Sequence, residues 1–216
     1  EHETYNGNFT VSADMTQEYL DSIGRITGNL YCADDVESFE MKNLKSIGGG
    51  IYCNGLYFLE SINLPNLETI NRTASTITLD SANRYISIGL ISCYALHTID
   101  MPKLKSTAGE IFLKENSELD TMKFDSLVST TRFTVRGNKF KNIRIDNLTN
   151  VGYDLAINDE LSLENVEFES LTTVTNGVYF YNNPNLKTII ANSLESTGGR
   201  MNIFDNTNLE SIQFKG

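Results

Sequence analysis

The amino-acid sequence predicts an all-β fold, a parallel β-helix in which about eight coils of ~23 residues stack along one axis behind an N-terminal helical cap. The first observation behind this prediction is a repeat that aligns without gaps. "GVYFYNNPNLKTII" at 177–190 matches "RMNIFDNTNLESIQF" at 200–214 and "EIFLKENSELDTMKF" at 110–124. Corresponding residues of the last three units are 23 positions apart, as in the series Leu155, Val178 and Met201. A fixed period in this range is typical of a solenoid.

The second observation is a pair of columns in the later half of the unit. Seven units have leucine at one position, namely Leu44, Leu67, Leu104, Leu127, Leu148, Leu171 and Leu194. Three residues further on, the same units have an aliphatic residue or threonine, namely Ile47, Ile70, Thr107, Thr130, Val151, Val174 and Thr197. Residues that recur at one place in every coil stack to form the core of a solenoid.

The third observation concerns local composition. The short segments favour Ile, Val, Phe, Tyr and Thr, which suit strands, and glycines mark the turns between them. Val178 and Phe180 then point into the core, whereas Tyr179 and Tyr181 point outward, because side chains alternate along a strand. The asparagines at 182–183 follow at a corner, where asparagine tolerates left-handed backbone and bonds stacked main-chain groups.

The chain is expected to be one solenoid domain over 1–216, with residues 1–23 as its cap, because both ends of such a rod need covering. Thr16 is the expected N-cap of a short helix whose inner face carries Tyr19, Leu20 and Ile23. The chain stops in the middle of a unit, at "LESIQFKG", so we expect the natural protein to continue.

One unit is 14 residues too long. Ile70 ends the apolar columns of its coil, and the next strand resumes only at Ile88. The surplus, residues 71–84, is expected to form an insertion on the outside of the rod, since a solenoid accommodates extra residues there. Residues 75–80 alternate in polarity, which indicates a short extra strand within the insertion.

Charge and hydropathy narrow the class of protein. The net charge is −11, from 17 basic and 28 acidic residues, which disfavours nucleic acids and anionic membrane surfaces as partners. No run approaches the length of a transmembrane span, and we expect no signal peptide within this sequence. Three glycosylation sequons, at Asn8, Asn71 and Asn147, favour an extracellular protein modestly.

The three cysteines are Cys32, Cys53 and Cys93. "GNLYC" and "GGIYC" align, so Cys32 and Cys53 are expected to stack in neighbouring coils and to point inward. Stacked strands place their Cα atoms about 4.8 Å apart, within reach of a disulfide. The alternative is a pair of buried thiols that pack as small apolar residues. Cys93 falls in the asparagine column and is expected to be unpaired.

"LDSIGRITGNLY", followed by "LKSIGGGIYCNGLYFLESINLPNLETI", resembles the receptor L-domains. Within that family the chain, over about residues 16–216, is most similar to the fungal cell-wall proteins of the ECM/SPS type. The resemblance implies a right-handed β-helix, an extracellular location and a role in cell-wall organisation. It also implies a glycosylphosphatidylinositol anchor on a C-terminal region that this sequence does not contain, which would be the chain's link to the membrane.

The sequence contains two weak candidates for a catalytic site. Asp34 and Asp35 form a carboxylate pair of the kind that glycosidases use, but a corner turn is the better interpretation. His97 lies in an outward column of varied residues and is interpreted as a solvated position. We identify no metal ligands and expect no cofactor.

An outward surface is the better candidate for function. Tyr31, Tyr52, Phe112 and Tyr179 are expected to stack along the rod on the outward side of the first strand of each unit, beside a column with Lys114, Arg136 and Tyr181. Aromatic rings next to cations suit a glycan or a protein, because rings stack on the apolar faces of sugars. The simpler alternative is that aromatic stacks stabilise an exposed sheet face.

Two functional hypotheses follow. The favoured one is a non-enzymatic, extracellular module of the cell wall or outer cell surface, acting in wall organisation or adhesion by binding a wall polysaccharide or a surface protein. The alternative is a polysaccharide-active β-helix hydrolase or lyase. The absence of a groove rich in Asp, Arg, Lys and His separates them at the level of sequence.

Overall fold

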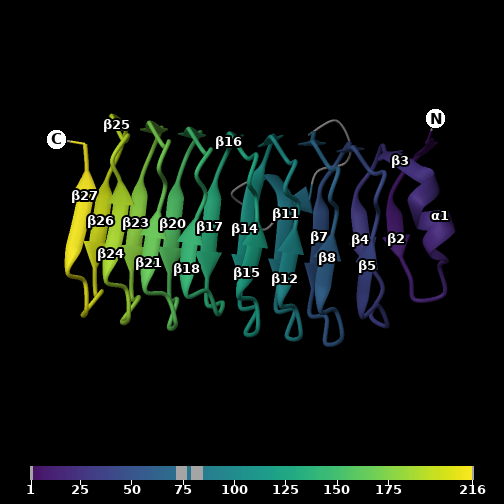
Figure 1. Cartoon of the computed structure of the whole chain (residues 1–216), viewed down its shortest axis with the longest axis horizontal. Coiled ribbons are helices and arrows are strands. Elements are labelled where there is room, and N and C mark those ends of the chain that lie inside the picture. Colours follow the sequence, from purple (N-terminus) through teal and green to yellow (C-terminus); the bar gives the residue numbers. More distant parts are fainter. Residues whose placement is uncertain (1, 72–76, 79–84, 216) are drawn as a thin grey trace.

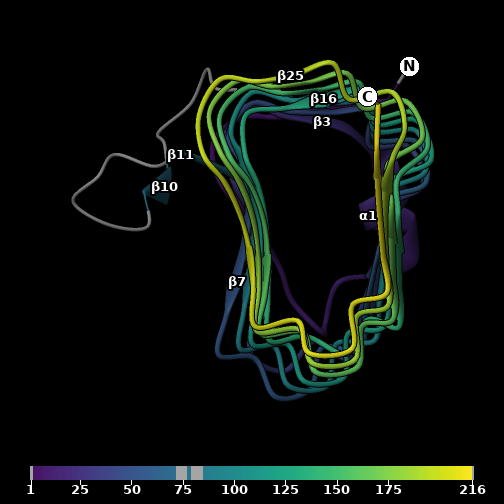
Figure 2. The same ribbon diagram turned by 90° about the vertical axis from the view of Figure 1, so that its left-hand side faces the viewer.

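The computed structural model describes residues 2–71, 77–78 and 85–215. Coils of three short strands stack along the long axis into a rod, with the two termini at opposite ends (Figure 1). Viewed along this axis, successive coils superpose on one cross-section (Figure 2). The prediction of an all-β parallel solenoid is therefore confirmed, with about nine coils against the eight expected, because two faces each stack nine parallel strands.

The first face is a parallel sheet of nine very short strands. They are β1 (Glu3–Tyr5), β3 (Ile23–Ile26), β6 (Ser46–Ile47), β9 (Thr69–Ile70), β13 (Ser106–Thr107), β16 (Ser129–Thr130), β19 (Asn150–Val151), β22 (Thr173–Val174) and β25 (Ser196–Thr197).

The second face contains the longest strands. They are β2 (Phe9–Val11), β4 (Leu30–Cys32), β7 (Ile51–Asn54), β11 (Tyr85–Ile91), β14 (Glu110–Lys114), β17 (Phe133–Arg136), β20 (Leu155–Asn158), β23 (Val178–Tyr181) and β26 (Met201–Phe204).

The third face is divided into two sheets of four strands. One contains β5 (Ser38–Glu40), β8 (Ser61–Asn63), β12 (Thr98–Asp100) and β15 (Thr121–Lys123), and the other contains β18 (Asn142–Arg144), β21 (Asn165–Glu167), β24 (Thr188–Ala191) and β27 (Ser211–Phe214). The break between β15 and β18 coincides with the coil that the repeat shows to be short, since Phe133 lies only 22 positions after its register partner Ile111.

The predicted columns form the core. All seven leucines of the first column are buried. Two threonines of the second column are buried as well, and their hydroxyls bond each other, with 2.8 Å between Thr107 Oγ1 and Thr130 Oγ1. This pairing satisfies both polar groups, so threonine can replace an aliphatic residue in the stack.

The N-terminal end is covered as expected by a short helix, α1 (Gln17–Ser22). The hydroxyl of Thr16 accepts a hydrogen bond from Tyr19 N at 3.2 Å, which makes Thr16 the N-cap. Leu20 and Ile23 are buried, but Tyr19 remains 40% exposed. The first eleven residues, which lack the repeat, already contribute β1 and β2.

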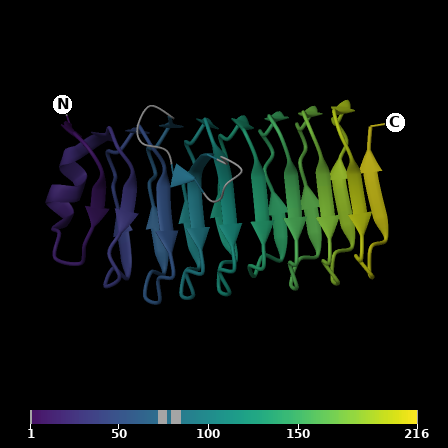
Figure 3. The ribbon, with the colours of Figure 1, turned by 180° about the vertical axis from the view of Figure 1, so that it is seen from behind.

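The described part of the insertion includes a short strand. β10 (Ile77–Thr78) pairs antiparallel with β11 in the register Ile77↔Ile86, so the extra strand is confirmed at these two residues. It lies outside the coil cross-section, over the second face (Figures 2 and 3). Ile88 pairs with Ile51 and Ile111, as the resumed repeat predicts. The rest of the proposed insertion, 72–76 and 79–84, lies outside the described residues.

The part of the chain that the structure describes contains no helix long and apolar enough to cross a membrane.

Candidate functional site

The outward side of the second face carries the predicted surface. Register pairs Tyr31 with Tyr52, and Tyr179 continues the same column four coils beyond Gly89. Phe112 lies next to Gly89 in this column, on the side opposite Tyr52. The column is therefore confirmed as a line of register partners. Gly89, Thr134 and Ala156 interrupt its aromatic members, so they do not form one continuous platform.

A shallow depression lies where the column side chains are small. It has a volume of about 240 Å³ and is lined by Arg132, Thr134, Asp154, Ala156, Asn158, Tyr179 and Tyr181. Ala156 lies between Thr134 and Tyr179 in register, so its methyl group leaves space beside the tyrosine. Tyr181 stacks on Phe204 with 5.1 Å between ring centroids and 9° between the planes. Of the predicted residues, only Tyr179 and Tyr181 line this depression.

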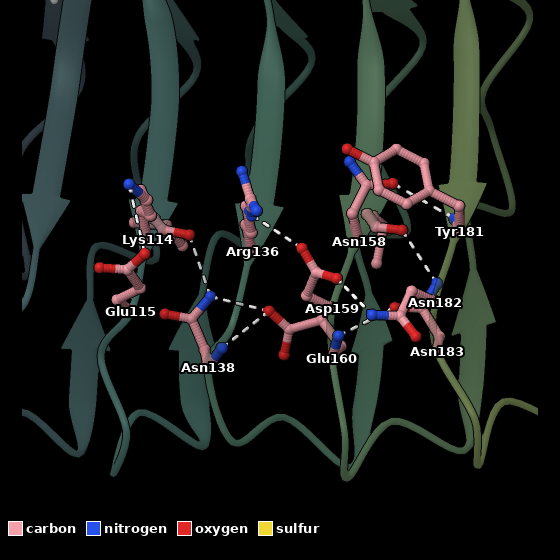
Figure 4. Close-up of polar contacts among 12 residues, drawn as sticks. Lys114, Glu115, Arg136, Asn138, Asn158, Asp159, Glu160, Tyr181, Asn182 and Asn183 are labelled. Carbon is pink, nitrogen blue, oxygen red and sulfur yellow. Dashed lines mark hydrogen bonds and ion pairs between the residues drawn. The ribbon is translucent and has the colours of Figure 1, made fainter. Parts of the chain in front are cut away.

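The cations of this face are paired. Arg136 Nε lies 2.7 Å from Asp159 Oδ2, and Lys114 Nζ lies 3.2 Å from Glu115 Oε1 (Figure 4). Arg132 packs over the ring of Tyr153, with 4.0 Å from Cζ to the ring centroid. Because each of these cations has an acidic or aromatic partner, the face suits an uncharged ligand better than an anionic one.

The corner that follows the second face carries a ladder of buried polar side chains (Figure 4). The coils from β7 to β26 enter it through a residue with left-handed backbone, and these seven residues are Gly55, Ser92, Glu115, Gly137, Asp159, Asn182 and Asp205. The next residue is a buried or half-buried asparagine in four coils, Asn116, Asn138, Asn183 and Asn206. The corner interpretation of the asparagine pair at 182–183 is therefore confirmed, with separate roles for the two residues.

The amides of this column bond along the rod. Asn138 Nδ2 donates to Leu113 O at 3.0 Å, in the preceding coil, and Asn116 Nδ2 donates to Asn138 Oδ1 at 2.9 Å. Cys93 occupies the same column, as predicted, and its N–H donates to Asn116 Oδ1 at 2.9 Å. The ladder satisfies main-chain groups at a corner where no strand pairing is available.

Glu160 replaces asparagine in one coil of the ladder and is fully buried. Its Oε1 accepts from Asn138 N and from Asn138 Nδ2, both at 2.9 Å. Its Oε2 is buried without a hydrogen-bond partner. Burial raises the pKa of this carboxyl to about 7, against the two hydrogen bonds from Asn138, which lower it.

Sequence reasoning missed an aromatic corner patch, which we define as Tyr57, Phe58 and Tyr94. Their exposed fractions are 68%, 61% and 43%, among the largest of any apolar side chain described. The rings of Tyr57 and Tyr94 lie 5.1 Å apart between centroids, with 35° between their planes. Tyr57 directly follows Leu56 and Tyr94 directly follows Cys93, and both preceding residues are buried. The available signal was two adjacent coils with an aromatic residue one position after the asparagine column.

The two candidate catalytic positions are solvent-exposed. Asp34 and Asp35 lie in a turn, and His97 is exposed at the corner, where its N–H donates to Glu60 O at 2.8 Å. A carboxyl that acts as a glycosidase acid is generally placed in apolar surroundings that keep it protonated. Within the described residues, no three His, Cys, Asp or Glu side chains are grouped so that they could hold a metal ion.

The three cysteines lie near one another and are free thiols in this structure. A hydrogen bond to Cys32 and burial raise the pKa of Cys53 well above its ordinary value, and burial raises the pKa of Cys93 to about 12. The two thiols of the stacked pair are therefore close, as predicted, and their oxidation to a disulfide stays a prediction. The three sequon asparagines, Asn8, Asn71 and Asn147, are all exposed.

Comparison with known proteins finds a fungal relative. The chain is 23% identical over 189 residues to the cell wall protein ecm33 of Schizosaccharomyces pombe. The match covers 81% of this chain but only 44% of the relative, so the chain spans less than half the length of that protein. No family model matches the chain, and no solved structure matches it.

Proposed function

We propose that the chain is a non-enzymatic, extracellular module of the cell wall or outer cell surface, which acts in wall organisation or adhesion by binding neutral wall polysaccharide through exposed aromatic side chains. The aromatic corner patch carries this proposal. The similarity to a cell wall protein supports the location, and the exposed rings support the mode of action.

The patch has the chemistry of a saccharide contact. The pyranose rings of sugars have apolar C–H faces, and aromatic rings stack on them. Tyr57 and Tyr94 follow β7 and β11, which pair in neighbouring coils, so their rings follow one another along the rod and suit a chain ligand that runs parallel to its axis. Their hydroxyls can also bond those of the sugar.

The charge around the patch favours an uncharged ligand. Glu60 lies on the loop of Tyr57 and Phe58, Asp120 lies on the loop of the coil after Tyr94, and the whole chain has a net charge of −11. Anionic polysaccharides and anionic membrane surfaces are therefore repelled, whereas carboxylates accept hydrogen bonds from the hydroxyls of neutral sugars.

The setting of the carboxylates supports a binding module over a polysaccharide-active enzyme. Asp34 and Asp35 are exposed and adjacent in one turn, whereas glycosidase carboxyls face each other across a substrate with about 5–9.5 Å between them. The depression beside Tyr179 contains one acidic residue, Asp154, whose Oδ2 lies 4.0 Å from Arg132 Nε.

Co-sedimentation with insoluble glucan and with chitin tests the proposal. The double variant Tyr57→Ser/Tyr94→Ser is expected to lose about tenfold or more in affinity, since each ring contributes on the order of 1 kcal/mol. The matched control, Tyr179→Ser/Tyr181→Ser, removes two tyrosines of the second face and is expected to bind like the wild type. Loss of binding in this control, with normal binding by the Tyr57/Tyr94 variant, would place the ligand on the second face instead. Failure of the wild type to bind any wall polysaccharide would contradict the proposal, and retention of a purified wall protein instead would assign a protein partner.

A further inference from the structure

Glu160 breaks the hydrogen-bond rule of the corner ladder. The amides of Asn116, Asn138 and Asn183 each serve two acceptors, a main-chain carbonyl of the preceding coil and a side-chain oxygen of the following one. Asn206 also donates to a carbonyl of the preceding coil. Asn183, in the coil after Glu160, donates to Ile157 O at 2.9 Å and to Asn206 Oδ1 at 3.0 Å. An ionised glutamate has no proton to donate, so it can serve neither acceptor.

Register identifies the carbonyl that Glu160 should reach. The carbonyls bonded in the other coils belong to Leu90, Leu113, Ile157 and Phe180. Val135 pairs with Leu113 on one side and with Ile157 on the other, so it supplies the equivalent carbonyl in the coil before Glu160. The second acceptor is Asn183 Oδ1, which already accepts from Glu160 N at 3.0 Å.

The buried oxygen Oε2 is therefore the group that stands in place of an amide nitrogen. It is the only oxygen of Glu160 without a partner, since Oε1 accepts twice from Asn138. A carboxylate oxygen held among acceptors would face like partial charges in a site sealed from water, which is costly. A protonated oxygen at the same place would donate, as the amide does.

The charged groups around Glu160 do not offset its charge. Asp159 is its neighbour in the chain, and its negative charge favours the neutral form of Glu160. Arg136, from the preceding coil, forms an ion pair with Asp159, with 2.7 Å between Arg136 Nε and Asp159 Oδ2. Lys139 and Lys141, on the loop of that coil, pair with Glu118 and Glu164. The following coil presents Asn182 and Asn183, which are neutral, and the inner side of the corner is the apolar core.

We propose that Glu160 occupies the ladder as the neutral acid, with its Oε2–H donating to Val135 O or to Asn183 Oδ1, and that this coil is an acid-stabilised, pH-sensitive element of the rod. Ionisation removes the donor and leaves a buried charge between two coils. In a neutral or alkaline medium, the hydrogen bonding between coils is then weakest at the corner between β17 and β23.

The sign of the pH dependence follows from linkage. The ordinary pKa of a glutamate is 4.5, and that of Glu160 in the folded chain is raised to about 7. Between these values the folded state binds more protons than the unfolded state, so stability falls as the pH rises. The contribution is complete below about pH 4.5 and is lost by about pH 7, in the opposite sense to an ordinary ion-paired carboxylate.

The experiment compares urea midpoints of the wild type and Glu160→Asn from pH 4.5 to 7.5. Asparagine restores the ladder, so the variant is expected to exceed the wild type at pH 7.5 and to lose that advantage toward pH 4.5. Glu164→Gln, on the same loop but ion-paired and only half-buried, is the matched control. The hydrogen bond from Lys187 lowers the pKa of Glu164, so this variant should show no advantage at high pH.

A measurement on the wild type makes the test independent of how the variants fold. Carbon-13 NMR of the Glu160 carboxyl should show a titration midpoint near 7. A midpoint near 4.5, or a difference between wild type and Glu160→Asn that does not change with pH, would overturn the proposal.

Discussion

The ring centroids of Tyr57 and Tyr94 lie 5.1 Å apart, although 37 positions separate the two residues in the sequence. The normal step between register partners in the later coils is 23, as between Val178 and Met201. The two tyrosines meet because β11 pairs with β7 in the register Ile88↔Ile51, so the extra residues between these two strands do not displace the coil that follows. The insertion and the aromatic corner patch thus belong to the same pair of coils.

Removal of the insertion is expected to leave the rod intact. Replacing 71–84 by a four-residue turn that contains glycine should change the free energy of unfolding by no more than about 1 kcal/mol, because closing a short surface loop costs little. Thermal unfolding of the deletion variant measures this. Loss of folding would show that Ile77 and its neighbours belong to the core.

The leucine column is expected to be the most sensitive part of the chain. Leu171 is buried, and Leu171→Ala should cost about 2–5 kcal/mol because it leaves a cavity between stacked coils. Leu171→Asp should prevent folding, since it buries an unpaired charge. Val128, whose exposed fraction is 44%, is the control, and Val128→Ala should fall within about 0.5 kcal/mol of wild type in urea unfolding.

Two of the residues with left-handed backbone at the corner, Gly137 and Ser92, are expected to respond in opposite ways to substitution. Gly137 has φ +69°, and Gly137→Ala should cost about 1–2 kcal/mol through backbone strain alone, because its nearest neighbour would be 3.6 Å from the added Cβ. Ser92 has φ 51°, so Ser92→Gly should be neutral or stabilising by up to about 1 kcal/mol. Equal effects of the two substitutions in chemical unfolding would argue against a shared corner conformation.

The buried thiols are expected to resist alkylation in the folded chain. The pKa values of Cys53 and Cys93 are both raised, so little thiolate is present at pH 8, and both sulfurs are buried. Mass spectrometry after iodoacetamide treatment should show labelling of these two residues only when urea is added. Labelling of the native protein within minutes would contradict the assigned burial. If Cys32 and Cys53 are bridged, both will label only after reduction.

The periodic parts of the fold could be predicted from the sequence, and the aperiodic parts could not. Leu171 and Val174 each belong to a column that recurs in seven units, so their burial follows from the repeat alone. β1 and β2 lack the motif, because Phe9 and Val11 continue the second face in a segment too short to show a period. Tyr57 and Phe58 were missed for a related reason: they follow the stacked asparagine column on exposed loops, where composition does not reveal which side chains cluster.

Glu160 could have been identified from the alignment, since it falls in the asparagine column of the unit. What the sequence could not supply was its burial, the unpartnered Oε2 and the direction of its pKa shift, because these depend on the hydrogen bonds that the neighbouring coils make. The predicted surface shows the same limit, since register aligned Tyr52 with Phe112 across Gly89, whose missing side chain separates them.

The central claim is that the chain binds wall polysaccharide without cleaving it. The direct measurement incubates the purified protein with insoluble wall glucan and quantifies both the protein bound and the reducing sugar released. We expect saturable binding that depends on Tyr57 and Tyr94, with no sugar released above the level of the polysaccharide alone. Release of soluble sugars that increases with protein and with time would contradict it and establish the polysaccharide-active enzyme.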